Sequence, residues 1–153
     1  MFQEVTSHIH PILVHFPIAL ITVAVLYDLW IAYKKDEFKP SKGLALWVVV
    51  VISAWIAVWT GPEDSANGNT NYIFLHSKLA DLTAIFVTLL TAYRIWTGVT
   101  QRKELFKKLV VPYLVVSIAS LVLVFSVGYF GGKMVYSDGV GVKVNNTLVN
   151  PPK

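Results

Sequence analysis

The residues of this sequence best suited to chemistry are its four histidines, three of which lie together in HIHPILVHFPIAL, residues 8–20. They are His8, His10 and His15, and the fourth is His76. A neutral imidazole binds a transition metal or a haem iron through one ring nitrogen. The 153 residues include no cysteine, which excludes disulfides, thiolate metal sites and covalent c-type haem attachment within this chain.

Four long apolar stretches must position these histidines. Only 14% of the residues are charged, against about 25% in a typical soluble domain. Stretches 12–33, 44–60, 73–96 and 109–130 are almost free of charge, and each approaches the roughly 20 residues that cross a bilayer as a helix. Short connections make successive helices antiparallel. We therefore expect an all-α integral membrane protein, an up-down bundle of four transmembrane helices over residues 12–132. An outer segment, 1–11, would precede the bundle, and a polar tail, 133–153, would follow it.

The basic residues predict the orientation of the bundle. Nine of the thirteen lysines and arginines lie in the loops after the first and third stretches or, for Arg94, near the end of the third. An excess of Lys and Arg marks the cytoplasmic side of a membrane. Both termini would then be periplasmic. This sorting accounts for the net charge of +4 without nucleic-acid binding.

This orientation predicts that two of the histidines face each other. His15 lies just over one turn into the first span and His76 about one turn into the third, so both have a similar depth. The first and third helices of a square bundle are diagonal neighbours, and bundle cores bind cofactors through side chains on facing helices. His15 and His76 would be the axial ligands of a haem b, and His10 and Asp64 would lie in the second shell around these ligands.

Two other interpretations of the histidines remain open. His10, His15 and His76, with Asp64 or Glu63, could bind zinc or copper through nitrogen and oxygen. Alternatively, each histidine is an interface residue or an interhelical hydrogen-bond partner without a ligand.

Four acidic or basic residues lie inside the predicted spans: Asp28, Lys78, Asp81 and Arg94. Asp28 and Arg94 have a similar depth near the inner ends of the first and third spans, and we interpret them as a structural ion pair. Asp81 lies about a turn and a half deeper than His76, where it could hydrogen-bond a ligand histidine or begin a proton path.

Several motifs resemble a known family. HPILVHFPIAL, TGPED after the second span, His76, and the closing GGKMVYSDGVGV are similar to the bacterial membrane family catalogued as domain of unknown function 2231. The resemblance implies a four-helix protein of the bacterial inner membrane. Relatives occur beside, or fused to, cytochrome c and Rieske-type domains, and this context favours a function in redox chemistry. The positions that match are His10, Pro11, His15, Pro17, Gly61, Asp64, His76, Gly131, Gly132, Tyr136, Gly139 and Gly141.

The chain departs from the family pattern at one position. Asp138 stands where the closing motif of the family usually has a histidine. Aspartate can bind zinc or copper, but it replaces a haem-binding histidine poorly.

Three functions follow from these features. The first is a b-type haem protein that transfers electrons, or a small subunit of a respiratory or other redox complex, with periplasmic cytochrome c or quinone as partner. The second is a cofactor-free accessory subunit of a larger membrane complex. The third is a zinc or copper site that faces the periplasm.

Overall fold

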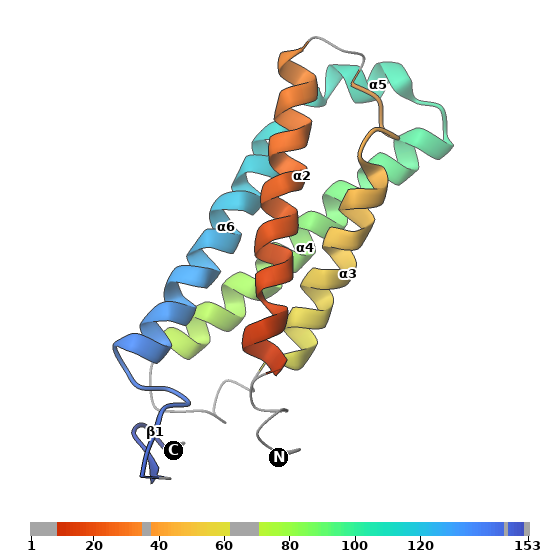
Figure 1. Cartoon of the computed structure of the whole chain (residues 1–153). Helices are drawn as coiled ribbons and strands as arrows, with labels where there is room; N and C mark the ends of the chain where they lie inside the picture. Colours follow the sequence, from red (N-terminus) through yellow and green to blue (C-terminus); the bar gives the residue numbers. More distant parts are fainter. Residues whose placement is uncertain (1–8, 35–37, 62–70, 146, 152–153) are drawn as a thin grey trace.

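The computed structural model of this chain describes residues 9–34, 38–61, 71–145 and 147–151 (Figure 1). Four long helices run alternately up and down: α2 (His15–Tyr33), α3 (Leu44–Thr60), α4 (Asn71–Val99) and α6 (Val110–Tyr136). Residues 9–13 are also helical, so the first helix extends over Ile9–Tyr33. A short helix, α5 (Lys103–Lys108), connects α4 to α6. The tail forms an antiparallel hairpin of β1 (Lys143–Val144) and β2 (Thr147–Leu148).

Each of the four charge-poor stretches lies in a helix, and the bounds differ from the prediction in two respects. α3 has the predicted bounds, the first helix and α4 extend beyond theirs by less than a turn at one or both ends, and α6 continues six residues beyond its predicted end at 130. The sequence did not predict α5 or the hairpin. Ile9–Tyr33, α4 and α6 are long and apolar enough to cross a membrane, and α3 is apolar but shorter at 17 residues.

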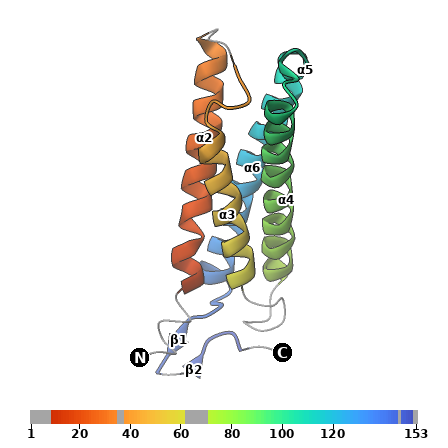
Figure 2. The same ribbon diagram turned by 90° about the vertical axis from the view of Figure 1, so that its right-hand side faces the viewer.

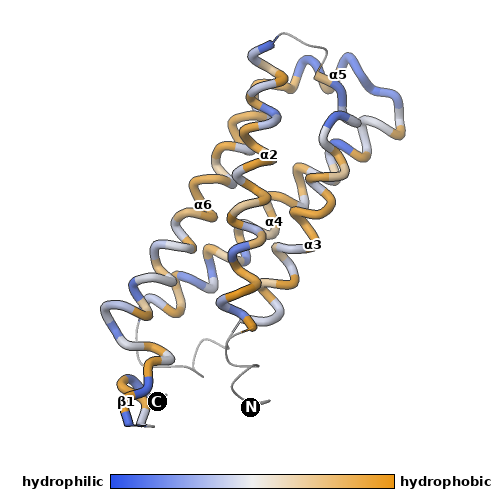
Figure 3. Tube along the Cα trace, in the orientation of Figure 1, coloured by the Kyte–Doolittle hydropathy of each residue, from blue (hydrophilic) through white to orange (hydrophobic). Residues whose placement is uncertain are grey.

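The long helices are mostly apolar along their length (Figure 3). Large aliphatic side chains such as Val23, Leu89 and Val122 are more than half exposed on the outside of the bundle. In water this surface would be unfavourable, and a helix that is apolar on every side is typical of a lipid environment.

The four helices form a square in which each packs on two neighbours: α2 on α3, α3 on α4, α4 on α6, and α6 on α2 (Figure 2). α2 and α4 therefore lie on a diagonal. The buried residues of α4 and α6 include Thr83, Ala84, Ser117 and Ser120. Small side chains of this kind let helix backbones approach closely in a membrane.

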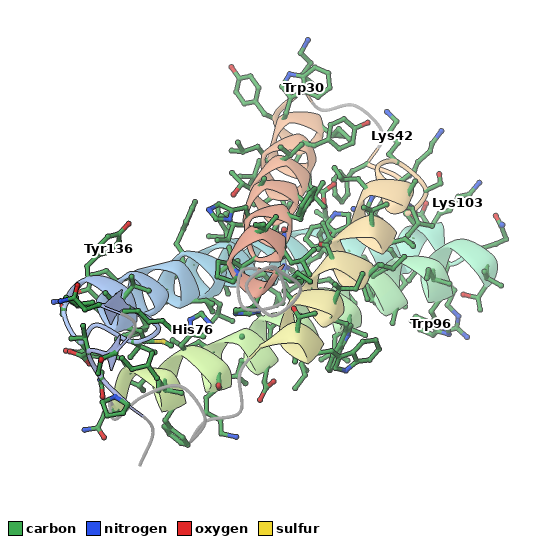
Figure 4. The ribbon with its side chains drawn as sticks, turned by 60° about the horizontal axis from the view of Figure 1, so that its bottom comes forward. Trp30, Lys42, His76, Trp96, Lys103 and Tyr136 are labelled. Carbon is green, nitrogen blue, oxygen red and sulfur yellow. The ribbon has the colours of Figure 1, made fainter. Side chains whose placement is uncertain are left out.

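The two ends of the bundle differ in chemistry. At one end, which we name the histidine end, lie His10, the end of α3, the start of α4 and the tail. Val140 of the tail packs there against Ile73 and Met134, so the tail is docked on α4 and α6. At the other end, the basic end, lie α5 and the connection from α2 to α3, with Lys42, Lys103 and other basic residues (Figure 4).

Candidate functional site

At the histidine end, His76 faces His10. The centres of the two imidazole rings are 6.2 Å apart, and the ring planes are nearly perpendicular at 86°. His76 lies between α4 and α6 when the bundle is viewed from this end (Figure 4). His10 comes from the first turn of the first helix, before α2 begins. The site thus joins the start of the chain to the middle of the sequence.

Hydrogen bonds fix which ring nitrogens carry protons. His76 Nδ1 donates to the Val127 carbonyl of α6 at 3.0 Å, and a carbonyl can only accept. His10 Nδ1 lies 3.4 Å from Thr60 Oγ1, a longer contact. The Thr60 hydroxyl donates to carbonyls of its own helix, and the His10 ring also hydrogen-bonds to the Ala57 backbone. His76 is therefore protonated at Nδ1, and its Nε2 keeps a lone pair that makes no hydrogen bond with the described residues.

Two glycines make room for the rings. A Cβ on Gly131 would lie 3.3 Å from both Cε1 and Nδ1 of His76, and a Cβ on Gly61 would lie 3.5 Å from Cε1 of His10. The close approach of His76 to α6 thus depends on Gly131. His10, Gly61, His76 and Gly131 come from four separate segments, and all four are positions that carry the family resemblance.

The histidine pair stands between two small cavities. One, of about 50 Å³, is lined by Gly61, Ser77 and Asp81 as well as by both histidines; we name it the polar chamber. The other, of about 40 Å³, is lined by both histidines and by residues of all four long helices. Because its further lining consists almost wholly of apolar side chains, among them Pro17, Ala54 and Val124, we name it the apolar chamber.

His15 does not take part in this site. Its side chain is exposed, and its Nδ1 donates to the Pro11 carbonyl one turn earlier at 2.6 Å. It lines neither chamber. The sequence placed His15 and His76 opposite each other because their depths match, but the structure brings His10 to that position. His10 and His15 are five residues apart, which is about 140° around a helix, so they cannot both face the core.

A signal in the spacing identifies His10. His10 precedes Asp28 by 18 residues, and His76 precedes Arg94 by the same number. Eighteen residues are five turns of an α-helix, so each histidine shares a helix face with one member of the ion pair. If Asp28 and Arg94 meet across the bundle, His10 and His76 must meet as well.

The other residues that the sequence suggested as candidates for chemistry are Asp81, Asp138, His8, Glu63 and Asp64. Asp81 is half-buried in the polar chamber. Asp138 lies beyond the end of α6 and lines neither chamber, and its backbone carbonyl accepts from Asn150 Nδ2. His8, Glu63 and Asp64 lie outside the described residues.

The ion pair between Asp28 and Arg94 is present at the basic end. Arg94 Nη1 lies 2.8 Å from Asp28 Oδ2, and both side chains are fully buried. Asp28 also accepts from Trp47 Nε1 at 2.8 Å and from the Tyr113 hydroxyl at 2.6 Å. Each of the four long helices thus contributes one residue to this network.

Arg94 also holds the connection between α2 and α3. Its Nε donates to the Pro40 carbonyl at 3.1 Å, and its Nη2 donates to the Lys42 carbonyl. Every nitrogen of the guanidinium therefore donates to a protein oxygen, and the network is closed to ligands.

The histidine end brings two imidazoles together beside two small chambers. Among the described residues, no three His, Cys, Asp or Glu side chains gather as one metal-sized group. A haem needs a pocket of about 300–1,000 Å³, as small-molecule sites have, and the chambers measure about 40 and 50 Å³. Both chambers are therefore smaller than a small-molecule site of that size.

Comparison with known proteins gives a family and no function. The sequence model of the family described as "Predicted membrane protein (DUF2231)" matches residues 6–144. No curated protein and no solved structure matches the chain.

Proposed function

We propose, from the premise that the chain belongs to the DUF2231 family of predicted membrane proteins, that it binds one copper or zinc ion between His10 and His76. The observation that carries this proposal is the pair of facing rings. His76 donates from Nδ1 to the Val127 carbonyl, which leaves its Nε2 for a ligand, and the His10 ring is held by Thr60 and by the backbone of Ala57. Metal-binding histidines commonly donate their second ring nitrogen to a carbonyl in this way, which fixes the tautomer and the ring orientation.

The separation of the rings suits one bridging ion. A Zn–N bond is about 2.0–2.1 Å long, and the ring centre lies roughly 1.2 Å beyond the nitrogen. Two ring centres that share an ion are then about 5.3 Å apart at a tetrahedral angle and about 6.5 Å apart when the nitrogens are opposed. The measured 6.2 Å falls between these limits, nearer to the opposed arrangement.

This geometry favours copper over zinc. Structural zinc is almost always bound by four ligands and catalytic zinc by three protein ligands and water, whereas cuprous ion is satisfied by two opposed imidazoles. Copper also binds nitrogen ligands more tightly than zinc does. Asp81, in the adjoining polar chamber, would accept a hydrogen bond from a water that completes the coordination of an oxidised ion.

We propose further that the bundle spans the membrane four times with the histidine end outside. α3, with 17 residues, is about 26 Å long, which crosses a hydrocarbon core of about 30 Å with local thinning of the bilayer. The basic end would face the cytoplasm by the distribution of Lys and Arg. The metal would then be accessible from the periplasm.

Elemental analysis tests the metal site. Protein purified from cells supplied with copper and zinc should hold one ion per chain, and competition with a chromophoric chelator should give its affinity. His10→Ala and His76→Ala should each weaken binding by roughly tenfold or more, because each removes one of two ligands. His15→Ala is the matched control and should bind the metal as the wild-type protein does.

Two outcomes would overturn the proposal. One is wild-type protein that takes up no ion under these conditions, and the other is equal binding by all three variants. A reduced-minus-oxidised optical spectrum of the same samples checks the haem hypothesis separately. A Soret band that disappears in His15→Ala would establish His15 as a haem ligand and replace the metal site proposed here.

A further inference from the structure

The apolar chamber beside the histidine pair differs from the polar chamber in what it can hold. It lies inside the bundle, between His10 and His76 at one end and Thr83 and Val124 at the other. Residues of all four long helices line it.

Away from the two histidines, the lining of this chamber offers little to a water molecule. The Thr83 hydroxyl donates to the Leu79 carbonyl of its own helix at 2.7 Å, so its proton is already used. The other residues away from the histidines are alanine, valine, isoleucine and proline. A water needs two to four polar partners, and cavities lined by apolar side chains stay dry and bind apolar ligands.

The size of the chamber limits its occupant. It measures about 40 Å³, whereas one water-sized probe needs about 10–15 Å³ on this measure. Two or three non-hydrogen atoms therefore fit. A quinone ring or another drug-sized molecule would need a pocket of about 300–1,000 Å³.

We propose that the apolar chamber binds a small neutral apolar molecule of two or three heavy atoms, the class of dissolved gases, directly beside the metal. This deepens the proposed function and rests on it for the metal, because the same two imidazoles border the chamber and would hold the ion. A molecule in the chamber would approach the ion from the core side, and water would approach it from the polar chamber.

Xenon is the probe that tests this inference without a metal. Crystals of the full chain under xenon pressure should show an anomalous peak in the chamber. Ala54→Val should abolish the peak, since Ala54 is 5% exposed and lines the chamber, so that the added methyl groups fill it. Ala92→Val, at an exposed position of α4, is the matched control and should keep the peak. Thermal unfolding of all samples shows that each variant is folded.

Three results would overturn the inference: ordered water that fills the chamber, a lipid acyl chain that enters it, or no xenon in a well-ordered crystal. Metal analysis of the same protein keeps this test apart from the previous one. Xenon in the chamber of a protein that binds no metal would sink the proposed metal site and leave the apolar site standing. A protein that binds the metal but shows no xenon in the chamber would overturn the apolar site and leave the proposed metal site standing.

Discussion

The buried ion pair at the basic end provides a quantitative test of how the bundle is held together. Arg94→Met keeps most of the length of the side chain and removes its charge and donors. The Asp28 carboxylate would remain buried with only Trp47 and Tyr113 to stabilise it. The Pro40 and Lys42 carbonyls would lose a donor. Breaking a buried pair in this way costs about 3–5 kcal/mol, a large part of the roughly 5–15 kcal/mol that stabilises a typical domain.

A double variant separates the effect of the buried charge on stability from the effect of side-chain packing. Asp28→Asn combined with Arg94→Met removes both charges, while the asparagine side-chain oxygen can still accept from Trp47 and Tyr113. Because no uncompensated charge is then buried, the double variant should be more stable than Arg94→Met alone. The exposed pair of Lys107 and Glu104, with nitrogen and oxygen 3.3 Å apart, supplies the control. Lys107→Met should change the free energy of unfolding by less than about 0.5 kcal/mol.

The assay is reversible unfolding of the purified protein in mixed micelles, followed by far-ultraviolet circular dichroism. A loss below about 1 kcal/mol for Arg94→Met would refute the reasoning, since exposed pairs contribute that little. A double variant less stable than Arg94→Met would also contradict it. That result would mean that the carboxylate is stabilised by groups other than the guanidinium.

Three further predictions follow from single positions. Gly131→Ala should weaken metal binding roughly tenfold, because its Cβ would lie 3.3 Å from the histidine ring, whereas Gly132→Ala, with 3.9 Å to its nearest neighbour, should leave the affinity unchanged in chelator competition. Gly43→Ala should lower the free energy of unfolding by more than about 1 kcal/mol in the same micelle assay, because Gly43 has φ +72° and its Cβ would come within 2.9 Å of a tyrosine ring. Since the chain has no native cysteine, Ser137→Cys should react with an impermeant maleimide in intact bacterial cells and Ser41→Cys only after lysis; the opposite pattern would invert the proposed orientation.

The sequence predicted the helices well because their signal is simple. A run of about 20 residues without charge has few alternatives to a helix in a membrane, where every backbone group must be hydrogen-bonded. It also predicted that Asp28 meets Arg94, since charges at the same depth of an apolar bundle need each other. The sequence did not predict α5 or the tail hairpin, because six-residue helices and two-residue strands are too short for a clear period.

The rotation of each helix is where inference from the pattern of apolar residues failed. In a soluble bundle the apolar face identifies the core, but here the lipid-facing residues are as apolar as the buried ones. Ile21 is fully buried and Val23 is 55% exposed, although both are aliphatic. The sequence therefore predicted the position of each side chain along the helix axis, but not the side of the helix that faces the core. For this reason His15 and His10 could not be distinguished by hydrophobicity. Small and polar residues such as Ser117 and Ser120 mark the core instead.

The charged pair supplies the missing rotation and links the two ends of the molecule. Once Asp28 and Arg94 are known to meet, the five-turn spacing requires His10 and His76 to meet about 27 Å away along the same helix faces. That distance is close to the thickness of the hydrocarbon core, so in the proposed four-span topology one polar pair would lie near each membrane surface. At the basic end every nitrogen of the Arg94 guanidinium donates to a protein oxygen. At the histidine end the Nδ1 proton of His76 is used within the protein, and its Nε2 lone pair makes no hydrogen bond with the described residues. The closed pair thus fixes the rotation of the helices, and the open pair is the end where a ligand can bind.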